Sequence, residues 1–170
     1  MSKYNDTIYA LSTPLGKSAL AVIRISGNQA YKVLKKITLL KKIKPNKTNL
    51  VLLQNQKKII DQVIAIYYEA PNSFTGEDVV EINCHGGFAV VNKISNTLSE
   101  KGLRLAEPGE FTKRALLNNK IDLVKTESIS DLINAETDKQ RELAIKNLSG
   151  GLSKFTKKIN NEISLVLANL

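Results

Sequence analysis

Cysteine and histidine are almost absent from this sequence of 170 residues, which contains one of each. Cys84 has no second cysteine with which to form an internal disulfide, and one cysteine beside one histidine is too few for a structural zinc site. No apolar run approaches the ~20 residues that a membrane-spanning helix needs. Residues 1–6 form neither an apolar signal core nor an Arg-rich presequence. These absences predict a cytoplasmic protein with no metal site and no membrane segment.

Carboxylates are missing from one long stretch, because no Asp or Glu lies between Asp6 and Asp61. Residues 1–60 contain 12 basic side chains and one acidic side chain, and the whole chain has a formal net charge of +9. Such a surface attracts phosphates, so one hypothesis is a basic RNA-binding module that acts through the stretch Lys32–Lys58. The alternative is an ordinary solvated surface, because the stretch lacks the arginine forks and interleaved aromatics that are typical of phosphate recognition. The lysines concerned are Lys32, Lys35, Lys36, Lys41, Lys42, Lys44, Lys47, Lys57 and Lys58.

One glycine is missing where a nucleotide-binding loop would need it. Gly16-Lys17-Ser18 resembles the end of a Gly-x-x-x-x-Gly-Lys-Ser/Thr loop, but the position five residues before Gly16 is Leu11. Without that glycine the backbone cannot wrap a triphosphate, and no other segment supplies the motif. We therefore expect that this chain neither binds nor hydrolyses GTP.

The adjacent pair Cys84-His85 does not form a nucleophile with its base, because neighbouring residues on a strand point to opposite faces. We expect Cys84 to pack in the core. His85, which precedes Gly86-Gly87, remains a candidate for lining a pocket. No residue of the chain is therefore predicted to be catalytic.

The order of sequence patterns divides the chain into a mixed part and a helical part. Before Pro108-Gly109, apolar and alternating runs predict strands and two further stretches predict helices, whereas no strand signal returns after it. The predicted fold class is α+β, with a first domain over residues 1–118 and the first helices of an all-helical domain over residues 119–170. The predicted strands are Thr7–Ser12, Ala19–Ile25, Asn49–Gln54, Ile59–Tyr68 and Val79–Asn83, and the predicted helices of the first part are Gln29–Ile37 and Val90–Leu98.

Local signals place the helices of the second part. Asp122 fits the N-cap of one helix, and Thr137 or Asp138 fits the N-cap of the next. Gly150-Gly151 predicts a kink or break. An apolar stripe then continues to the last residue, so we expect either that the chain is the front portion of a longer protein or that its last helix packs on a partner surface. The stripe consists of Ala144, Leu148, Leu152, Phe155, Ile159, Ile163, Val166 and Leu170.

Three polar segments that contain glycine hold the remaining candidate residues. The first, Ser12–Gly27, places Arg24 within an otherwise apolar strand, where a charge needs a partner. The second, Asn72–Gly87, contains three carboxylates and places Glu81 on a strand. The third covers residues 104–123. Taken alone, each segment fits an ordinary turn, and Arg24 and Glu81 would then simply pair with each other.

In their order and spacing, these three segments closely resemble the N-terminal part of the tRNA modification GTPase family known as MnmE or TrmE. The third segment includes the run Pro-Gly-Glu-Phe-Thr-Lys-Arg at residues 108–114, and the resemblance extends from about Asp6 to the end of the chain. It implies a folate-binding α/β domain that dimerises and is related in fold to folate-dependent aminomethyltransferases. A helical domain follows in that family, with a GTP-hydrolysing domain inserted into it. Because this chain ends before the GTPase domain, GTP, Mg²⁺ and K⁺ are expected to bind only outside it.

The resemblance also implies a function for the whole protein. Together with a flavin-dependent partner, MnmG, members of this family modify the wobble uridine (U34) of certain tRNAs with a one-carbon unit from a reduced folate. The expected cofactor of this chain is therefore 5-formyltetrahydrofolate or 5,10-methylenetetrahydrofolate. The expected partners are a second copy of the chain, MnmG and tRNA. A stand-alone folate-dependent one-carbon transferase is the remaining alternative.

The family's folate-binding positions correspond to Arg24, Glu81 and Lys120 in this sequence. Glu81 would accept hydrogen bonds from the adjacent N–H and 2-amino groups of the pterin ring, whereas Arg24 and Lys120 would bind the carboxylates of the folate tail. The sequence departs from the family pattern at Asn119, where glycine is favoured. Asparagine can adopt the left-handed backbone conformation that glycine would adopt there.

Overall fold

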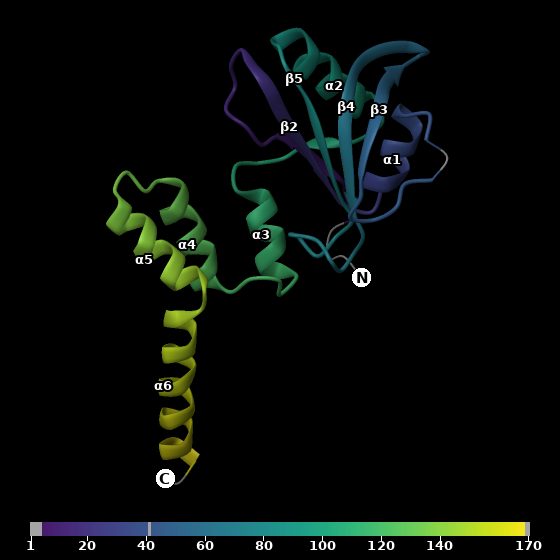
Figure 1. Ribbon diagram of the computed structural model, residues 1–170. Coiled ribbons are helices and arrows are strands. Elements are labelled where there is room, and N and C mark those ends of the chain that lie inside the picture. Colours follow the sequence, from purple (N-terminus) through teal and green to yellow (C-terminus); the bar gives the residue numbers. More distant parts are fainter. Residues whose placement is uncertain (1–4, 41, 169–170) are drawn as a thin grey trace. The chain divides into compact units, whose positions relative to one another are not determined.

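The computed structural model describes residues 5–40 and 42–168, except for the side chains of residues 152–154, 157, 158, 166 and 168. The chain divides into two compact units, residues 1–120 and residues 121–170, which Figure 1 shows in sequence colours. The first unit contains a mixed sheet with three helices, and the described residues of the second unit form helices only. The predicted α+β class is therefore confirmed.

A six-stranded sheet forms the first unit, with the strand order β3-β4-β5-β2-β1-β6. All neighbouring strands are antiparallel except β1 and β6, which are parallel. Positive φ angles at Gln56 and Lys57 form the two-residue turn between β3 and β4, which suits the twist of a hairpin. The strands are β1 (Ile8–Leu11), β2 (Ser18–Ser26), β3 (Thr48–Asn55), β4 (Lys58–Tyr68), β5 (Val79–Gly86) and β6 (Arg104–Leu105).

The five predicted strands are all present, but the sequence analysis missed β6. This strand has only two residues, Arg104 and Leu105, and both are exposed. It forms because the Arg104 N–H donates to the carbonyl oxygen of Thr7 at 3.0 Å and the Ala106 N–H donates to that of Tyr9 at 2.9 Å. A strand this short has no apolar alternation, so only its position beside β1 defines it.

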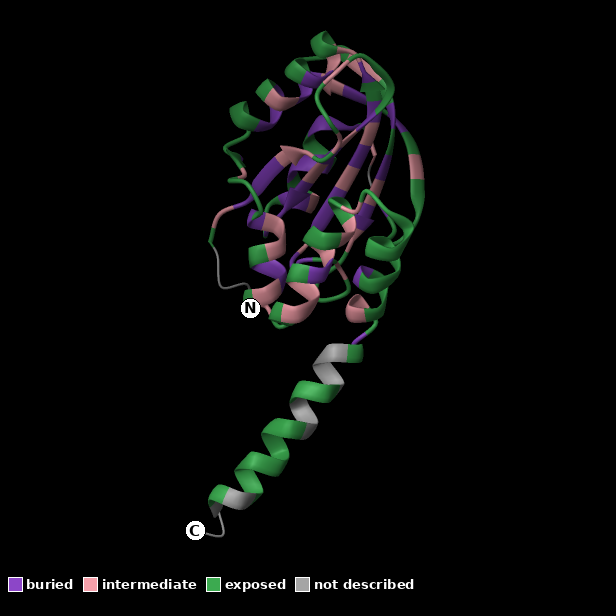
Figure 2. Ribbon diagram, turned by 90° about the vertical axis from the view of Figure 1, so that its left-hand side faces the viewer, coloured by how far each residue is buried: buried purple, intermediate pink, exposed green. Residues whose placement is uncertain are grey.

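Alternation along the strands gives the sheet a closed face and an open face (Figure 2). The closed face is buried under α1 (Ala30–Ile37) and α2 (Phe88–Glu100), and its largest contributors include Ile23, Ile25 and Ile82, which have no exposed surface. The side chains at the intervening positions point to the open face and are half-buried or exposed. They are Leu20, Val22, Arg24, Leu50, Leu52, Ile64, Ile66, Glu81 and Asn83.

The helix α3 (Glu110–Leu117) follows Gly109, whose φ of +74° lies in the left-handed region that favours glycine. This turn aims the helix so that Glu110, Arg114 and Ala115 are buried in the first unit. Asn119, just past the helix, has a φ of +56°, so it adopts the left-handed conformation expected from the sequence.

The second unit consists of α4 (Leu123–Ile133), α5 (Asp138–Leu148) and α6 (Gly151–Ala168). Both predicted N-caps are confirmed: Asp122 accepts the Lys125 N–H at 2.8 Å, and Thr137 forms a capping box with Gln140. The predicted break is also confirmed, since α5 ends before Gly150 and α6 begins after it.

Of the predicted apolar stripe, Ala144 is buried, whereas Phe155, Ile159 and Ile163 are 59%, 39% and 51% exposed. Its members Leu152, Val166 and Leu170 lie outside the described side chains. Within the described residues, no helix is both long enough and apolar enough to cross a membrane.

Candidate functional site

An ion pair between neighbouring strands lies at the centre of the candidate site. Arg24 on β2 and Glu81 on β5 are direct partners in the strand register, so their side chains leave the sheet side by side on the open face. The Arg24 Nε and Nη2 atoms donate to the same Glu81 oxygen, Oε1, at 2.9 Å and 2.7 Å. Both side chains keep about a quarter of their surface exposed, at 28% and 21%. The pairing that the sequence left open therefore exists.

Aromatic rings surround this ion pair. The guanidinium carbon of Arg24 lies 5.7 Å from the ring centre of Phe74 and 5.8 Å from that of Phe111, which is a cation–π arrangement. Tyr68 donates its hydroxyl to the second Glu81 oxygen at 3.4 Å. Burial, together with the negative charge of Glu81, raises the pKa of Tyr68. Flat rings beside a carboxylate and a guanidinium offer both stacking and polar contacts to an aromatic ligand.

The third predicted residue, Lys120, contacts the same loop that supplies Phe74. Its Nζ donates to the carbonyl oxygen of Pro71 at 2.8 Å, and its side-chain carbons pass close to Gly76, where a Cβ would lie 3.0 Å from Lys120 Cγ. Asn118 fixes the loop from the same side by donating to the Thr75 carbonyl oxygen at 2.7 Å. The loop over residues 69–78 thus links Lys120 to the neighbourhood of Arg24.

A cavity of about 520 Å³ opens beside this loop. Asn118 and Gly76, two neighbours of Lys120, contribute to its wall, but neither Arg24 nor Glu81 is among its described lining residues. The volume is within the range of small-molecule pockets. Its lining residues are Asn28, Ala70, Pro71, Gly76, Glu77, Asp78 and Asn118.

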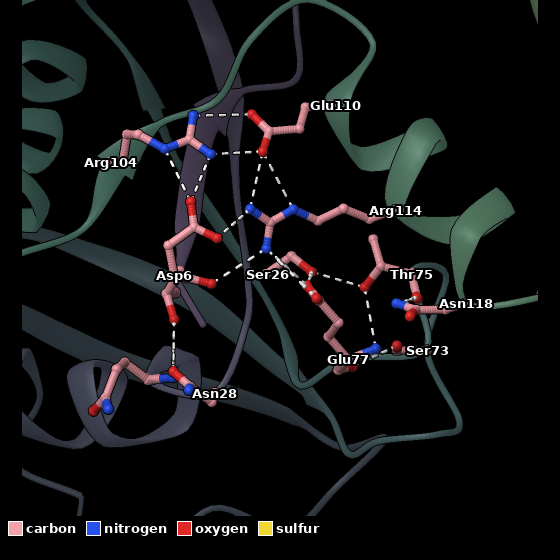
Figure 3. Close-up of polar contacts among 12 residues, drawn as sticks. Asp6, Ser26, Asn28, Ser73, Thr75, Glu77, Arg104, Glu110, Arg114 and Asn118 are labelled. Atoms are coloured by element: carbon pink, nitrogen blue, oxygen red, sulfur yellow. Dashed lines mark hydrogen bonds and ion pairs between the residues drawn. The ribbon is translucent and has the colours of Figure 1, made fainter. Parts of the chain in front are cut away.

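A buried network of charges holds the loop against α3 (Figure 3). The side chain of Arg114 has no exposed surface, and its guanidinium donates to Asp6 at 2.7 Å, Glu110 at 2.9 Å and Glu77 at 3.3 Å. Arg104 closes the network with 2.6 Å contacts to Asp6 and Glu110. Because Glu77 belongs to the loop and Arg114 to α3, the network fixes the position of the loop relative to α3.

The network extends into the end of β2. Ser26 donates to Glu77 Oε2 at 2.7 Å and shares a 2.7 Å hydrogen bond with Thr75. Gly27 has a φ of +131°, and a Cβ there would lie 2.7 Å from the Asp6 carbonyl oxygen, so only glycine lets the segment before β1 approach this closely. Every charge in the network is therefore matched with opposite charge or a hydroxyl donor, which is the condition for burying it.

The network lowers the pKa of two of its carboxyl groups, those of Glu110 and Asp6. The hydrogen bonds that Arg104 donates lower the pKa of Glu110 to about 2 despite its burial. Burial alone would raise the pKa of Asp6, but the hydrogen bonds from Arg104 and Arg114 outweigh it and leave the pKa below its ordinary value. In the same way, burial opposes the charge of Arg114, whereas Glu110 and Asp6 raise its pKa.

The strand end that carries Cys84 and His85 confirms that the two side chains diverge. Cys84 is buried in the core, and burial raises the pKa of its thiol to about 11. His85 is 69% exposed, and its Nδ1 lies 2.7 Å from Asp61 Oδ1. The described residues contain no group of three or more His, Cys, Asp or Glu side chains that could hold a metal ion.

Arg24 and Lys120 contact one loop, and Glu81 is paired with Arg24, whereas sequence reasoning missed the Arg114 network that supports the loop. The signal was present in the run of residues 108–114, where Glu110 and Arg114 stand four positions apart and so share one helix face. The sequence alone does not reveal that Asp6 and Glu77 lie against that helix face.

The sequence of this chain is similar to those of known proteins. Residues 7–120 match the family model described as the N-terminus of the GTP-binding protein TrmE. A protein of Lactococcus lactis subsp. lactis named tRNA modification GTPase MnmE is 46% identical over 168 residues, and one of Thermotoga maritima with the same name is 42% identical over 166 residues. Both alignments cover 97% of this chain and 37% of the relative. The chain thus spans a little over one third of the length of the curated relatives that it matches.

Proposed function

This chain belongs to the family of the N-terminal part of the GTP-binding protein TrmE, and from that premise we propose that it is the folate-binding and dimerising part of a tRNA modification GTPase. It binds 5-formyltetrahydrofolate or 5,10-methylenetetrahydrofolate through Arg24, Glu81 and Lys120. In the whole cytoplasmic protein, which acts with MnmG on the wobble uridine of tRNA, GTP, Mg²⁺ and K⁺ bind in the part beyond this chain.

One observation supports the folate site above the others: Arg24 and Lys120 both contact the loop of residues 69–78, through Phe74 and Pro71, and Glu81 is paired with Arg24. In the proposed complex the pterin ring lies against Phe74 or Phe111, and the Glu81 carboxylate receives its N–H donors. Lys120 supplies a cation for the tail carboxylates. Arg24 both restrains Glu81 and compensates its charge.

Calorimetric titration with 5-formyltetrahydrofolate tests this site. Losing one charge-assisted hydrogen bond costs about 1.5–3 kcal/mol, so Glu81→Gln and Lys120→Ala should each weaken binding by roughly 10- to 100-fold. Glu142→Gln and Lys139→Ala, on exposed positions of α5, remove the same charges and should leave affinity unchanged. If both site variants fold and bind folate as tightly as the unchanged chain, the site is elsewhere.

The open face supports the dimerisation. Leu50, Leu52 and Ile64 are 68%, 41% and 43% exposed on neighbouring strands, which is apolar surface that a second copy of the chain would cover. Light scattering tests this interface with Ile64→Glu, which should give a monomer. Ile163→Glu on α6, where the side chain is 51% exposed, is the matched control. A monomer produced by the control alone would move the interface to α6.

The chain should show no GTPase turnover of its own. Leu11 replaces the glycine that a phosphate-wrapping loop needs, and β1 ends at that residue. A GTPase assay of the purified chain tests this, with Lys17→Ala as the control. Turnover that disappears in Lys17→Ala would show that Gly16-Lys17-Ser18 does bind nucleotide.

A further inference from the structure

We propose that six lysines at the β3 side of the first unit form one surface that binds the phosphate backbone of tRNA. This surface, called the lysine face below, consists of Lys32, Lys35, Lys36, Lys42, Lys44 and Lys47. The inference rests on the proposed function for the identity of the RNA. The surface itself is defined by the fold.

The helix α1 presents three of these lysines on one side. Ala30, Val33, Leu34 and Ile37 are buried against the closed face of the sheet. The positions i, i+3 and i+4 of a helix share a face, so Lys32, Lys35 and Lys36 stand together on the side away from the core. All three are exposed.

The segment over residues 38–47 returns along the same helix and adds three more. At its start Thr38 bridges to Leu53 on β3, and at its end the Asn46 N–H donates to the carbonyl oxygen of Tyr67 at 2.8 Å. Tyr67 also packs against Tyr31 of α1, with ring centres 4.7 Å apart. The two ends of the segment therefore lie near the two ends of α1, beside the edge strand β3 (Figure 1).

The burial of one residue also determines the direction of the lysine side chains in the segment over residues 38–47. Ile43 is 2% exposed and belongs to the hydrophobic core, whereas its neighbours Lys42 and Lys44 are exposed. Anchoring Ile43 in the core thus turns Lys42 and Lys44 outward together.

The positive charge of the lysine face is not neutralised by the described part of the chain. None of its lysines forms an ion pair with a described carboxylate, and the only aromatic contact is Lys35 Nζ at 5.6 Å from the Tyr31 ring centre. Lys57 and Lys58 are not included, because a negative charge lies at their hairpin. Asn55 of this hairpin donates to the carboxylate of Glu100 at 2.7 Å.

The chemistry of the face selects the kind of partner. Ammonium groups on flexible stems attract phosphates as point charges and read no sequence, unlike arginine forks. A long polyanion that contacts several of them gains affinity by releasing counterions. Curated relatives are named tRNA modification GTPases, and tRNA is a polyanion of this kind.

Filter binding of an unmodified tRNA transcript to the whole chain over a series of salt concentrations tests the inference. The variant carries Lys32→Gln, Lys35→Gln, Lys42→Gln and Lys44→Gln. The matched control carries Lys93→Gln, Lys101→Gln, Lys139→Gln and Lys146→Gln, which are exposed elsewhere and change the net charge equally. Each lost phosphate contact lowers the slope of log Kobs against log salt by about 0.7–0.9, so the variant slope should fall by roughly 3 and the control slope by less than about 1.

Each result bears on the inference. Equal losses in variant and control mean that net charge alone attracts RNA, and an unchanged variant means that tRNA binds elsewhere; either overturns the proposal. Binding of the unchanged chain to phosphatidylserine vesicles but not to tRNA would overturn it in favour of a membrane surface. Titration of the same variant with 5-formyltetrahydrofolate should give unchanged affinity. If the unchanged chain fails to bind folate while its tRNA binding depends on the lysine face, only the proposed folate function is wrong.

Discussion

In the first unit, Arg114 has no exposed surface and pairs with three carboxylates, whereas in the second unit Arg141 pairs with Asp138 at the surface, with side-chain exposures of 52% and 75%. The residue types are the same, and the contact distances of 2.7–3.3 Å and 2.8 Å are similar. Water screens the Arg141–Asp138 pair, whereas the contacts of Arg114 with Glu77 and Glu110 are shielded from it. We therefore expect burial, more than contact distance, to decide how much each ion pair contributes to the free energy of unfolding.

Apolar side chains are also more buried in the first unit than in the described part of the second unit. In the first unit the closed face of the sheet buries a continuous core. Among the described residues of the second unit, Ala144 is the buried apolar side chain, whereas Ile133, Leu143 and Leu165 are 78%, 60% and 65% exposed. We therefore expect the first unit to resist denaturation by itself and the second to depend on helix propensity and capping.

The largest expected effect is the loss of the buried guanidinium. Arg114→Met removes the buried guanidinium that Glu77 and Glu110 contact, which should lower the free energy of unfolding by about 3–5 kcal/mol. Arg141→Met, the surface counterpart, should cost no more than about 0.5 kcal/mol. In urea denaturation, tyrosine fluorescence reports the first unit, because all five tyrosines lie within residues 4–68 and the chain has no tryptophan. Circular dichroism at 222 nm also follows the helices of the second unit, so the two signals together measure both variants. Equal losses in the two variants would contradict the comparison.

A smaller effect should appear on acidification. The pKa of Glu110 is lowered from 4.5 to about 2 in the folded chain. As the pH falls, Glu110 is therefore protonated in the unfolded chain before it is protonated in the folded chain. The stability that Glu110 contributes is complete above pH 4.5 and is lost as the pH falls toward 2. That contribution is about 3 kcal/mol. Tyrosine-monitored urea midpoints of the unchanged chain should fall more steeply across this interval than those of Glu110→Gln, and parallel curves would refute the assignment.

The smallest effect should be confined to the second unit. Thr137→Ala removes the half of the capping box in which the Thr137 hydroxyl oxygen accepts the Gln140 N–H, and it should cost about 1 kcal/mol of helix stability. Circular dichroism at 222 nm should detect this loss, while tyrosine fluorescence should not. Thr126→Ala, inside α4, is the control, because alanine is favoured in a helix interior. A shift of the tyrosine transition by Thr137→Ala would mean that the two units unfold as one.

Much of this architecture follows from local patterns. The strand Ala19–Ile25 was predicted because a nearly continuous apolar run is typical of a buried strand, and the caps Asp122 and Thr137 because their side chains satisfy the first helical N–H groups. Arg24 was singled out because a charge in an apolar strand needs a partner. These inferences use only neighbours in the sequence.

What escaped prediction depends on distant contacts. The strand β6 exists only because residues 7 and 9 lie beside it, and the partners of Arg114 come from two segments far away in the sequence. No periodic pattern in the sequence predicts contacts between segments that lie so far apart. The folate role of Arg24, Glu81 and Lys120 came from the family resemblance and stays a prediction.

The pairing of Asp6 with Arg114 spans 108 positions, and this span has a consequence for the time at which the first unit can fold during synthesis. A nascent chain that stops before residue 114 has already made Asp6, Glu77 and Glu110 but not the guanidinium that their burial requires. The parallel strand β6 also joins β1 late, since it begins at residue 104. Because non-local contacts form only after long segments of chain have been brought together, the first unit should close in a single late step rather than strand by strand as it is made.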